Sequence, residues 1–216
     1  LLGSTEKSQY SASINYRNKQ GILPNAGMDM LSARSFIQTK CLNDRLEVSA
    51  SLNASVRNGR WLPSANGNGE SVYQSIYYFS PLCPVTNPDG TWYDGTGVVS
   101  QNYNPVAMLN ENHYQGKNKF IQGVVKGAFT ITDGLVWNLT ASYQNHQNLY
   151  NGYDSINSQL AASASKHGLA SRSESESEKK QLETWISYDK TFADVHKLSI
   201  MGGYSWEQSD SGDGFG

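Results

Sequence analysis

Residues able to perform catalysis or bind a metal are few in this chain, and they are not spaced for a shared site. The 216 residues include 4 histidines and 2 cysteines. The histidines lack the HxxxH spacing that brings two imidazoles to one metal ion, and neither a CxxC nor a GxSxG motif occurs. The histidines are His113, His146, His167 and His196. We therefore expect no catalytic residue, no metal site and no cofactor, and we predict that the protein is not an enzyme.

One segment faintly resembles a calcium-binding loop. TNPDGTWYDG, residues 86–95, carries Asn87, Asp89 and Asp94 beside glycines. It lacks the bidentate glutamate that closes such a loop. Pro88-Asp89-Gly90 is also a sufficient signal for a tight turn. We favour the turn and leave calcium binding open.

The elements that position the polar side chains are predicted from alternation. In RLEVSASLNASVRNG, residues 45–59, Leu46 and Leu52 belong to an apolar set, whereas Glu47 and Asn53 belong to a polar set. A period of two over this length indicates a strand with one apolar and one polar face. About seven such strands are expected, at residues 9–18, 29–41, 45–58, 118–131, 135–148, 182–191 and 196–208.

Composition and loop lengths indicate whether these strands lie in water or in a membrane. The chain is 38% hydrophobic and 17% charged, with net charge −2 and mean hydropathy −0.56. This balance gives no sign of a nucleic-acid partner. Short connections alternate with long ones, and the long ones include residues 59–117 and 149–181. That alternation is typical of an up-and-down barrel in the outer membrane, with its apolar face toward lipid and its polar face toward a lumen.

The barrel arrangement also predicts where the aromatic residues and the cysteines lie along the strands. Aromatic residues of the apolar face gather near both strand ends, as in the girdles of a membrane barrel. Cys41 is expected at the end with short turns and Cys83 at the end with long loops, too far apart for a disulfide. The segment SASASKHGLASRSESESEKK, residues 161–180, is of low complexity and is predicted to be a surface loop.

Two sets of candidate binding residues follow from this topology. Polar-face residues predicted to line the lumen are Asn15, Arg17, Arg34, Gln38, Glu47, Asn53, Arg57, Gln122, Lys126 and Gln144. Aromatic residues of the first long loop suit a ligand, a partner or packing within the loop. Those predicted to contact a ligand or partner are Trp61, Tyr73, Tyr77, Tyr78, Trp92, Tyr93 and Tyr103.

A succession of short motifs resembles the early barrel strands of the SusC/RagA family of TonB-dependent outer-membrane transporters. The motifs are a YSAS strand, a QGI turn, an AR strand, the segment from Lys40 to Gly59, an NPVA segment from Asn104 to Ala107, and a strand–turn–strand from Phe129 to Leu135. Each motif alone has low specificity for the family, but the order and spacing of all the motifs together are specific. They cover nearly the whole chain.

The resemblance implies a fold, a location and partners. The fold class is all-β, an antiparallel meander forming part of a large barrel. A barrel of this class has about 22 strands and a plug, so we expect the chain to be a piece of a longer protein. The implied protein lies in the outer membrane of a Gram-negative bacterium and imports an oligosaccharide or oligopeptide, driven by TonB and working with a SusD-like lipoprotein.

Two rival functions stay open at this stage. A soluble all-β module that binds glycans would bury the apolar face in a sandwich core. A TonB-dependent receptor for siderophores or cobalamin would share the barrel but differ in cargo and partner.

Overall fold

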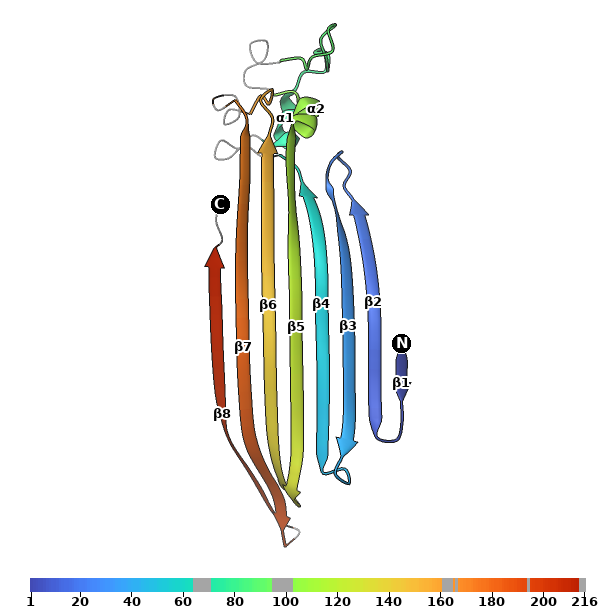
Figure 1. Ribbon diagram of the computed structural model, residues 1–216, viewed down its shortest axis with the longest axis vertical. Coiled ribbons are helices and arrows are strands. Elements are labelled where there is room, and N and C mark those ends of the chain that lie inside the picture. Colours follow the sequence, from blue (N-terminus) through green and yellow to red (C-terminus); the bar gives the residue numbers. More distant parts are fainter. Residues whose placement is uncertain (64–70, 95–102, 161–164, 166, 194, 214–216) are drawn as a thin grey trace.

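Eight antiparallel strands form one open sheet, in which strands adjacent in sequence pair with each other (Figure 1). The computed structural model describes residues 1–63, 71–94, 103–160, 165, 167–193 and 195–213. The strands are β1 (Leu2–Ser4), β2 (Ser8–Gln20), β3 (Gly27–Cys41), β4 (Leu46–Trp61), β5 (Asn112–Thr132), β6 (Leu135–Asp154), β7 (Leu169–Phe192) and β8 (His196–Asp213). The predicted fold class, an antiparallel meander that forms part of a barrel, is confirmed.

Short turns close the hairpins at the lower end of Figure 1. The β3–β4 turn passes through Leu42, Asn43 and Asp44, all with positive φ. In the β5–β6 turn, Gly134 has φ +78°, and a Cβ there would lie 2.3 Å from the carbonyl oxygen of Asp189. Only glycine meets both demands without strain. Both turns were predicted from the sequence.

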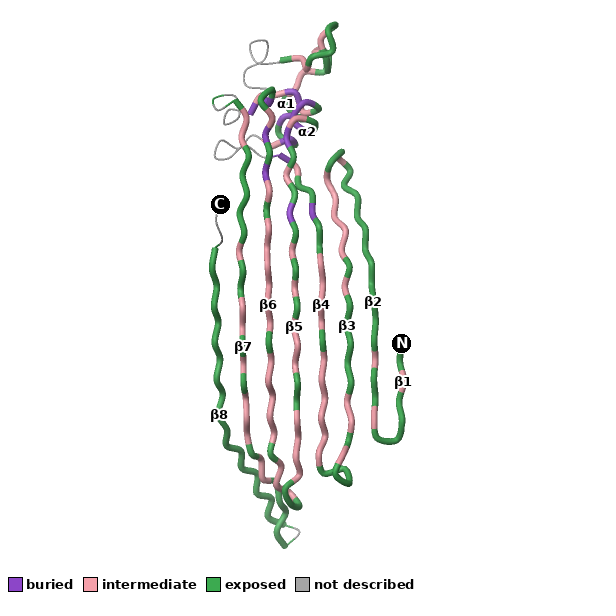
Figure 2. Tube along the Cα trace, viewed as in Figure 1, coloured by how far each residue is buried: buried purple, intermediate pink, exposed green. Residues whose placement is uncertain are grey.

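Two short helices and the segments around them lie at the opposite end of the sheet. They are α1 (Val72–Tyr78) and α2 (Pro105–Glu111), and we call residues 71–94, 103–111 and 155–160 the cap. Val72, Met108, Leu109 and Leu160 form its buried cluster. Figure 2 shows that burial is concentrated here and that the strands are mostly intermediate or exposed. Among the described helices, none has the length and apolar character needed to cross a membrane.

The predicted long loops are partly wrong. β5 begins at Asn112, β6 continues to Asp154 and β7 begins at Leu169, so all three strands extend into the predicted loops 59–117 and 149–181. These strand ends lack the apolar–polar contrast on which the prediction depended. In β7, serine alternates with charged residues instead. Residues 161–164 and 166 of the predicted low-complexity loop lie outside the described residues.

Candidate functional site

The register of the sheet defines two faces of opposite character. Leu52 lies opposite Ser35 and Gly123, whereas Asn53 lies opposite Arg34 and Gln122. We call the face that carries Leu52 the apolar face and the face that carries Asn53 the polar face. The register places the predicted lumen residues together on the polar face: Asn15, Arg17, Arg34, Gln38, Glu47, Asn53, Arg57, Gln122, Lys126 and Gln144.

Amide and guanidinium groups form a row across the middle of the polar face. Arg34, Asn53, Gln122 and Gln144 lie side by side on β3 to β6. The amide nitrogen of Asn53 lies 3.4 Å from the side-chain oxygen of Gln122. Since side chains directly opposite in a sheet are about 5 Å apart, this row presents closely spaced donors and acceptors. Such a surface can hold a polar ligand.

A second network lies two polar-face rows closer to the cap. Arg57 donates to the Oδ1 atom of Asn118 through Nε at 3.0 Å and through Nη2 at 2.8 Å. Asn118 donates in turn to Asn148, and Asn148 lies 3.4 Å from the hydroxyl of Ser175. The sequence analysis included Arg57 but missed its partners. Asn118 occupies a polar position of a predicted strand, so the alternation could have identified it.

Several polar-face cations have no partner among the described residues. Gln38 donates to Glu47 at 2.7 Å. In contrast, the side chains of Arg17, Arg34 and Lys126 make no hydrogen bond or ion pair with any residue that the structure describes. Their charges are therefore free to meet an anionic or carbonyl group of a ligand.

The polar face continues onto two strands from which no candidate residue was chosen. Ser173, Ser175 and Ser177 of β7 lie on the polar face beside β6. Lys179 forms an ion pair of 3.0 Å with Glu207 of β8. The β7 serines were missed because their segment was predicted to be a loop.

The apolar face changes to polar residues at a level that shifts from strand to strand. Asn18, Asp29, Asn58 and Lys117 share one register row near the cap end. On later strands the change comes lower. Apolar neighbours still lie opposite the first polar residue of each strand: Val56 opposite Lys119, Ile121 opposite Asn145, and Tyr143 opposite Lys180. The boundary therefore descends in steps of about two residues between β4 and β7, as expected where alternate residues share a face.

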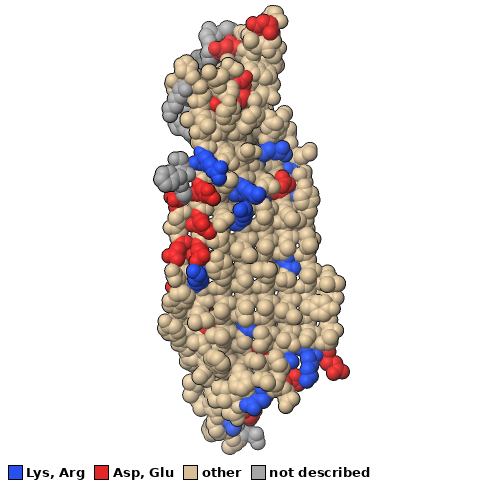
Figure 3. Space-filling model, viewed as in Figure 1, with Lys and Arg blue, Asp and Glu red and all other residues tan. Residues whose placement is uncertain are grey.

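Charges are also absent from the middle of the apolar face. On β7, Leu182, Thr184, Ile186 and Tyr188 separate Lys180 from Lys190. Figure 3 shows a surface with few charges over the middle of the sheet, with acidic residues gathered over upper β7 and β8 and basic residues beside them. The lower turns also step down from β1–β2 to β7–β8 in Figure 1. Both ends of the uncharged band thus slope in the same direction.

Three aromatic residues meet at the cap end of the polar face. The ring centroids of Trp61 and Tyr150 are 5.8 Å apart, and those of Tyr114 and Tyr150 are 6.2 Å apart. A Cβ at Gly116 would lie 2.6 Å from the Trp61 ring, so the indole lies directly over this glycine. Trp61 was predicted as a candidate, but its ring partners Tyr114 and Tyr150 were not.

The other aromatic candidates divide into structural and exposed residues. The indole of Trp92 donates to Glu111 at 2.8 Å, and Tyr103 packs against the cap cluster. A hydrogen bond with the thiol of Cys83 raises the pKa of Tyr93. Exposed tyrosines of α1 are Tyr73, Tyr77 and Tyr78. Only these α1 tyrosines present most of their surface to solvent, with Tyr77 89% exposed.

Comparison of the amino-acid sequence with known proteins identifies relatives of this chain. No model of a known protein family matches the chain. TonB-dependent receptor P3 of Formosa agariphila is 24% identical over 210 residues, which is 95% of this chain and 20% of that protein. TonB-dependent receptor P26 of the same organism is 24% identical over 214 residues, which is 96% of this chain and 20% of that protein. The chain is similar to a segment of a TonB-dependent receptor.

Solved structures give the same fold. The RagAB peptide importer in its open-open state matches with a TM-score of 0.75 at 15% identity, over 99% of this chain and 24% of that chain. Its closed-closed state matches with a TM-score of 0.73 over 99% of this chain and 25% of that chain. This chain, which we call the barrel segment, spans about a fifth of the length of the two Formosa agariphila receptors. The predicted resemblance to SusC/RagA-type transporters is confirmed.

The NPVA motif of the barrel segment has a structural role in the cap. Asn104, with no exposed surface, precedes Pro105 and caps α2. Its Oδ1 accepts from the amides of Val106 and Ala107, at 3.1 and 3.3 Å. Its Nδ2 donates to the carbonyl oxygens of Val85 and Tyr93, at 2.7 and 3.3 Å. An asparagine before a proline is a helix-start signal, so this cap could have been found from the sequence.

The acidic segment near residue 89 forms a turn. The Oδ1 atom of Asp89 accepts from the amide and the hydroxyl of Thr91, at 3.0 and 2.6 Å, and these bonds lower the pKa of Asp89. Gly90 has φ +86°, and Thr86 pairs with Trp92. Among the described residues, no cluster of three or more histidine, cysteine or acidic side chains is arranged to hold a metal ion. Asp89 therefore stabilises a tight turn.

Proposed function

We propose that the barrel segment belongs to an outer-membrane importer that depends on TonB and takes up an oligosaccharide or oligopeptide. Its apolar face meets lipid and its polar face lines the transport lumen. The observation that carries this proposal is the sloping polar boundary of the apolar face. A bilayer has a flat surface, so strands that cross it at a tilt must change character at successively different register positions.

The slope of the polar boundary corresponds to the strand tilt of a membrane barrel. The boundary descends by about six residues from β2 to β8, or about one residue per strand. With a rise of about 3.3 Å per residue and about 4.8 Å between strands, the strands tilt by about 35°. Membrane barrels have strand tilts of about 35–45°. A soluble sheet has no reason to place its boundary along this line.

The width of the uncharged band supports the same placement. Lys180 and Lys190 of β7 lie about ten residues, or about 33 Å, apart along the strand. At the tilt of a membrane barrel this corresponds to about 25 Å along the bilayer normal, close to the apolar band of outer-membrane barrels. The β-sandwich alternative would need a second sheet packed on the apolar face, whereas the described strands form a single sheet.

The residues of such an importer act by binding and positioning. Arg34, Asn53 and Gln122 supply hydrogen bonds to hydroxyl, amide or carboxylate groups of cargo in the lumen. The exposed tyrosines of α1 offer a surface to a SusD-like lipoprotein lid, because tyrosine is enriched at protein interfaces. The RagAB importer, with the same fold, is described as carrying peptides, which supports an oligomeric cargo.

Adjacent positions of β4 test the proposal in the full-length protein. Single cysteines at positions 51 and 52, in place of Ser51 and Leu52, should respond oppositely. Cys at 52 should react with a lipid-soluble maleimide, and a fluorophore placed there should be quenched by spin-labelled lipid. Cys at 51 should show neither response. Equal labelling of both positions from water, or no lipid quenching at 52, would refute a membrane-facing apolar face.

A further inference from the structure

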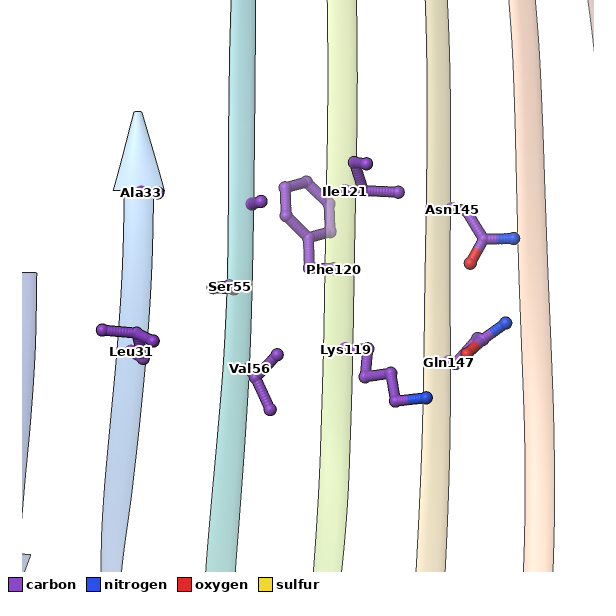
Figure 4. A pocket seen from close by; sticks show the side chains of 10 residues that line it. Leu31, Ala33, Ser55, Val56, Lys119, Phe120, Ile121, Asn145 and Gln147 are labelled. Atoms are coloured by element: carbon purple, nitrogen blue, oxygen red, sulfur yellow. The ribbon is translucent and has the colours of Figure 1, made fainter. Parts of the chain in front are cut away.

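A depression in the apolar face lies next to two exposed lysines near the cap end of the sheet. It has a volume of about 350 Å³, and its apolar lining includes Leu31, Ala33, Ala54, Val56 and Ile121. Ala33 and Ala54 lie directly opposite each other, between larger neighbours. These two small side chains leave the hollow shown in Figure 4.

Lysines mark the side of the depression closest to the cap. Lys119 lines it, and Lys117 lies two residues further toward the cap on the same face of β5. Two such residues are about 6.6 Å apart along a strand, so both ammonium groups can reach one phosphate. Neither lysine side chain makes a hydrogen bond or ion pair with a described residue, and both residues are exposed. Arg60, one register row nearer the cap, adds a third cation.

The described carboxylates on either side form no ion pair with these two lysines. Asp29, on the β3 side, accepts a hydrogen bond of 2.7 Å from Asn58, which lies between it and Lys117. On the β7 side, Glu176 accepts from Asn145 and Gln147 at 2.6 and 3.0 Å. Figure 4 shows Lys119 extending toward Gln147. The acidic groups are therefore hydrogen-bonded to amides, and both lysines stay exposed.

We propose that this site binds one anionic lipid, with an acyl chain against Ala33 and Ala54 and a headgroup phosphate between Lys117 and Lys119. The inference rests on the proposed function, because it needs the apolar face to meet lipid. Lys119 is the first charged residue of β5 beyond the uncharged band. That is the level at which headgroup phosphates lie. Charge complementarity and an apolar hollow below the charges together favour a phosphate-bearing lipid over a neutral one.

Lipid retention by the full-length protein tests this site. The protein is reconstituted in equimolar phosphatidylglycerol and phosphatidylcholine and then re-extracted in mild detergent, and the retained lipids are quantified by mass spectrometry. The unmodified protein should retain phosphatidylglycerol in excess. The double variant K117Q/K119Q should lower this preference by about tenfold or more. K126Q, which removes a lysine from the polar face, is the matched control and should leave the preference unchanged.

A second variant separates the hollow from the charges. Ala54→Phe fills the depression while both lysines remain, and it should also lower phosphatidylglycerol retention. An unchanged phosphatidylglycerol preference in K117Q/K119Q would overturn the site. If lipid still quenches a fluorophore at position 52 in that case, only this inference fails. Loss of that quenching in the otherwise unmodified protein would instead refute the proposed function.

Discussion

At the scale of single residues, Asn104 holds three parts of the cap together. Its side chain caps α2 and donates to the carbonyl oxygens of Val85 and Tyr93, and Asn104 itself has no exposed surface. Asn104→Ala removes the helix cap and takes the side-chain donor from the carbonyl oxygen of Tyr93, whereas the carbonyl oxygen of Val85 keeps the amide of Tyr93 as a partner. We therefore expect it to destabilise the cap by about 2 kcal/mol. Limited proteolysis of the full-length protein should then cut the cap faster, while the barrel stays resistant.

Asn110 provides the matched control for that prediction. Its Nδ2 donates one hydrogen bond, to the carbonyl oxygen of Val106 at 2.8 Å, and the contact is exposed. Asn110→Ala should change proteolysis little, because water replaces the lost partner. Equal sensitivity of the two variants would show that burial of Asn104 does not matter.

At the scale of elements, the two faces of β4 predict opposite responses to charge. Leu52→Arg places a guanidinium on the apolar face near the middle of the strand, at an expected cost of about 2–4 kcal/mol in a membrane barrel. Ser51→Arg places the same group beside Val124 on the polar face, where water reaches it, and should cost much less. Urea titration of the full-length protein in lipid measures both. A larger cost for Ser51→Arg would reverse the assignment of the faces.

The β5–β6 turn gives a second prediction at the scale of elements. Gly134→Ala combines a positive φ with a contact of 2.3 Å to the Asp189 carbonyl oxygen, so it should destabilise the hairpin by more than about 1 kcal/mol. Gly123→Ala, in the middle of β5, meets no atom within 4 Å and should be nearly neutral. The same urea titration compares them. Similar midpoints for the two variants would contradict the role of Gly134.

Strands could be predicted from the sequence where their two faces lie in chemically different environments. In β4, apolar and polar residues alternate because the two faces of the strand differ, so alternation predicted both the strand and the face of Asn53. In the upper part of β7, Ser175 and Ser177 alternate with Glu176 and Glu178. Both faces are polar there, so no contrast in hydrophobicity indicates a strand. The ring cluster of Trp61, Tyr114 and Tyr150 depends on a register between distant segments, which one sequence does not reveal.

At the scale of the whole molecule, the 216-residue chain by itself lacks what a stable sheet needs. The edge strand β8 is exposed along its described length and pairs only with β7. The apolar face is bare as well, with Ile14 80% exposed and Ile200 57% exposed. Unpaired strand edges and exposed apolar surface both promote association between chains.

These two liabilities can be told apart by adding detergent to the isolated chain. In detergent-free buffer we expect aggregation, measured by light scattering, without a cooperative melting transition. Micelles cover the apolar face but leave the backbone groups of β8 unpaired, so detergent should reduce the aggregates to small oligomers and not to monomers. Monomers in detergent would mean that the apolar face alone drives association. A sharp, cooperative melt of a monomer without detergent would contradict both parts, because the sheet would then be stable with its edge and its apolar face in water.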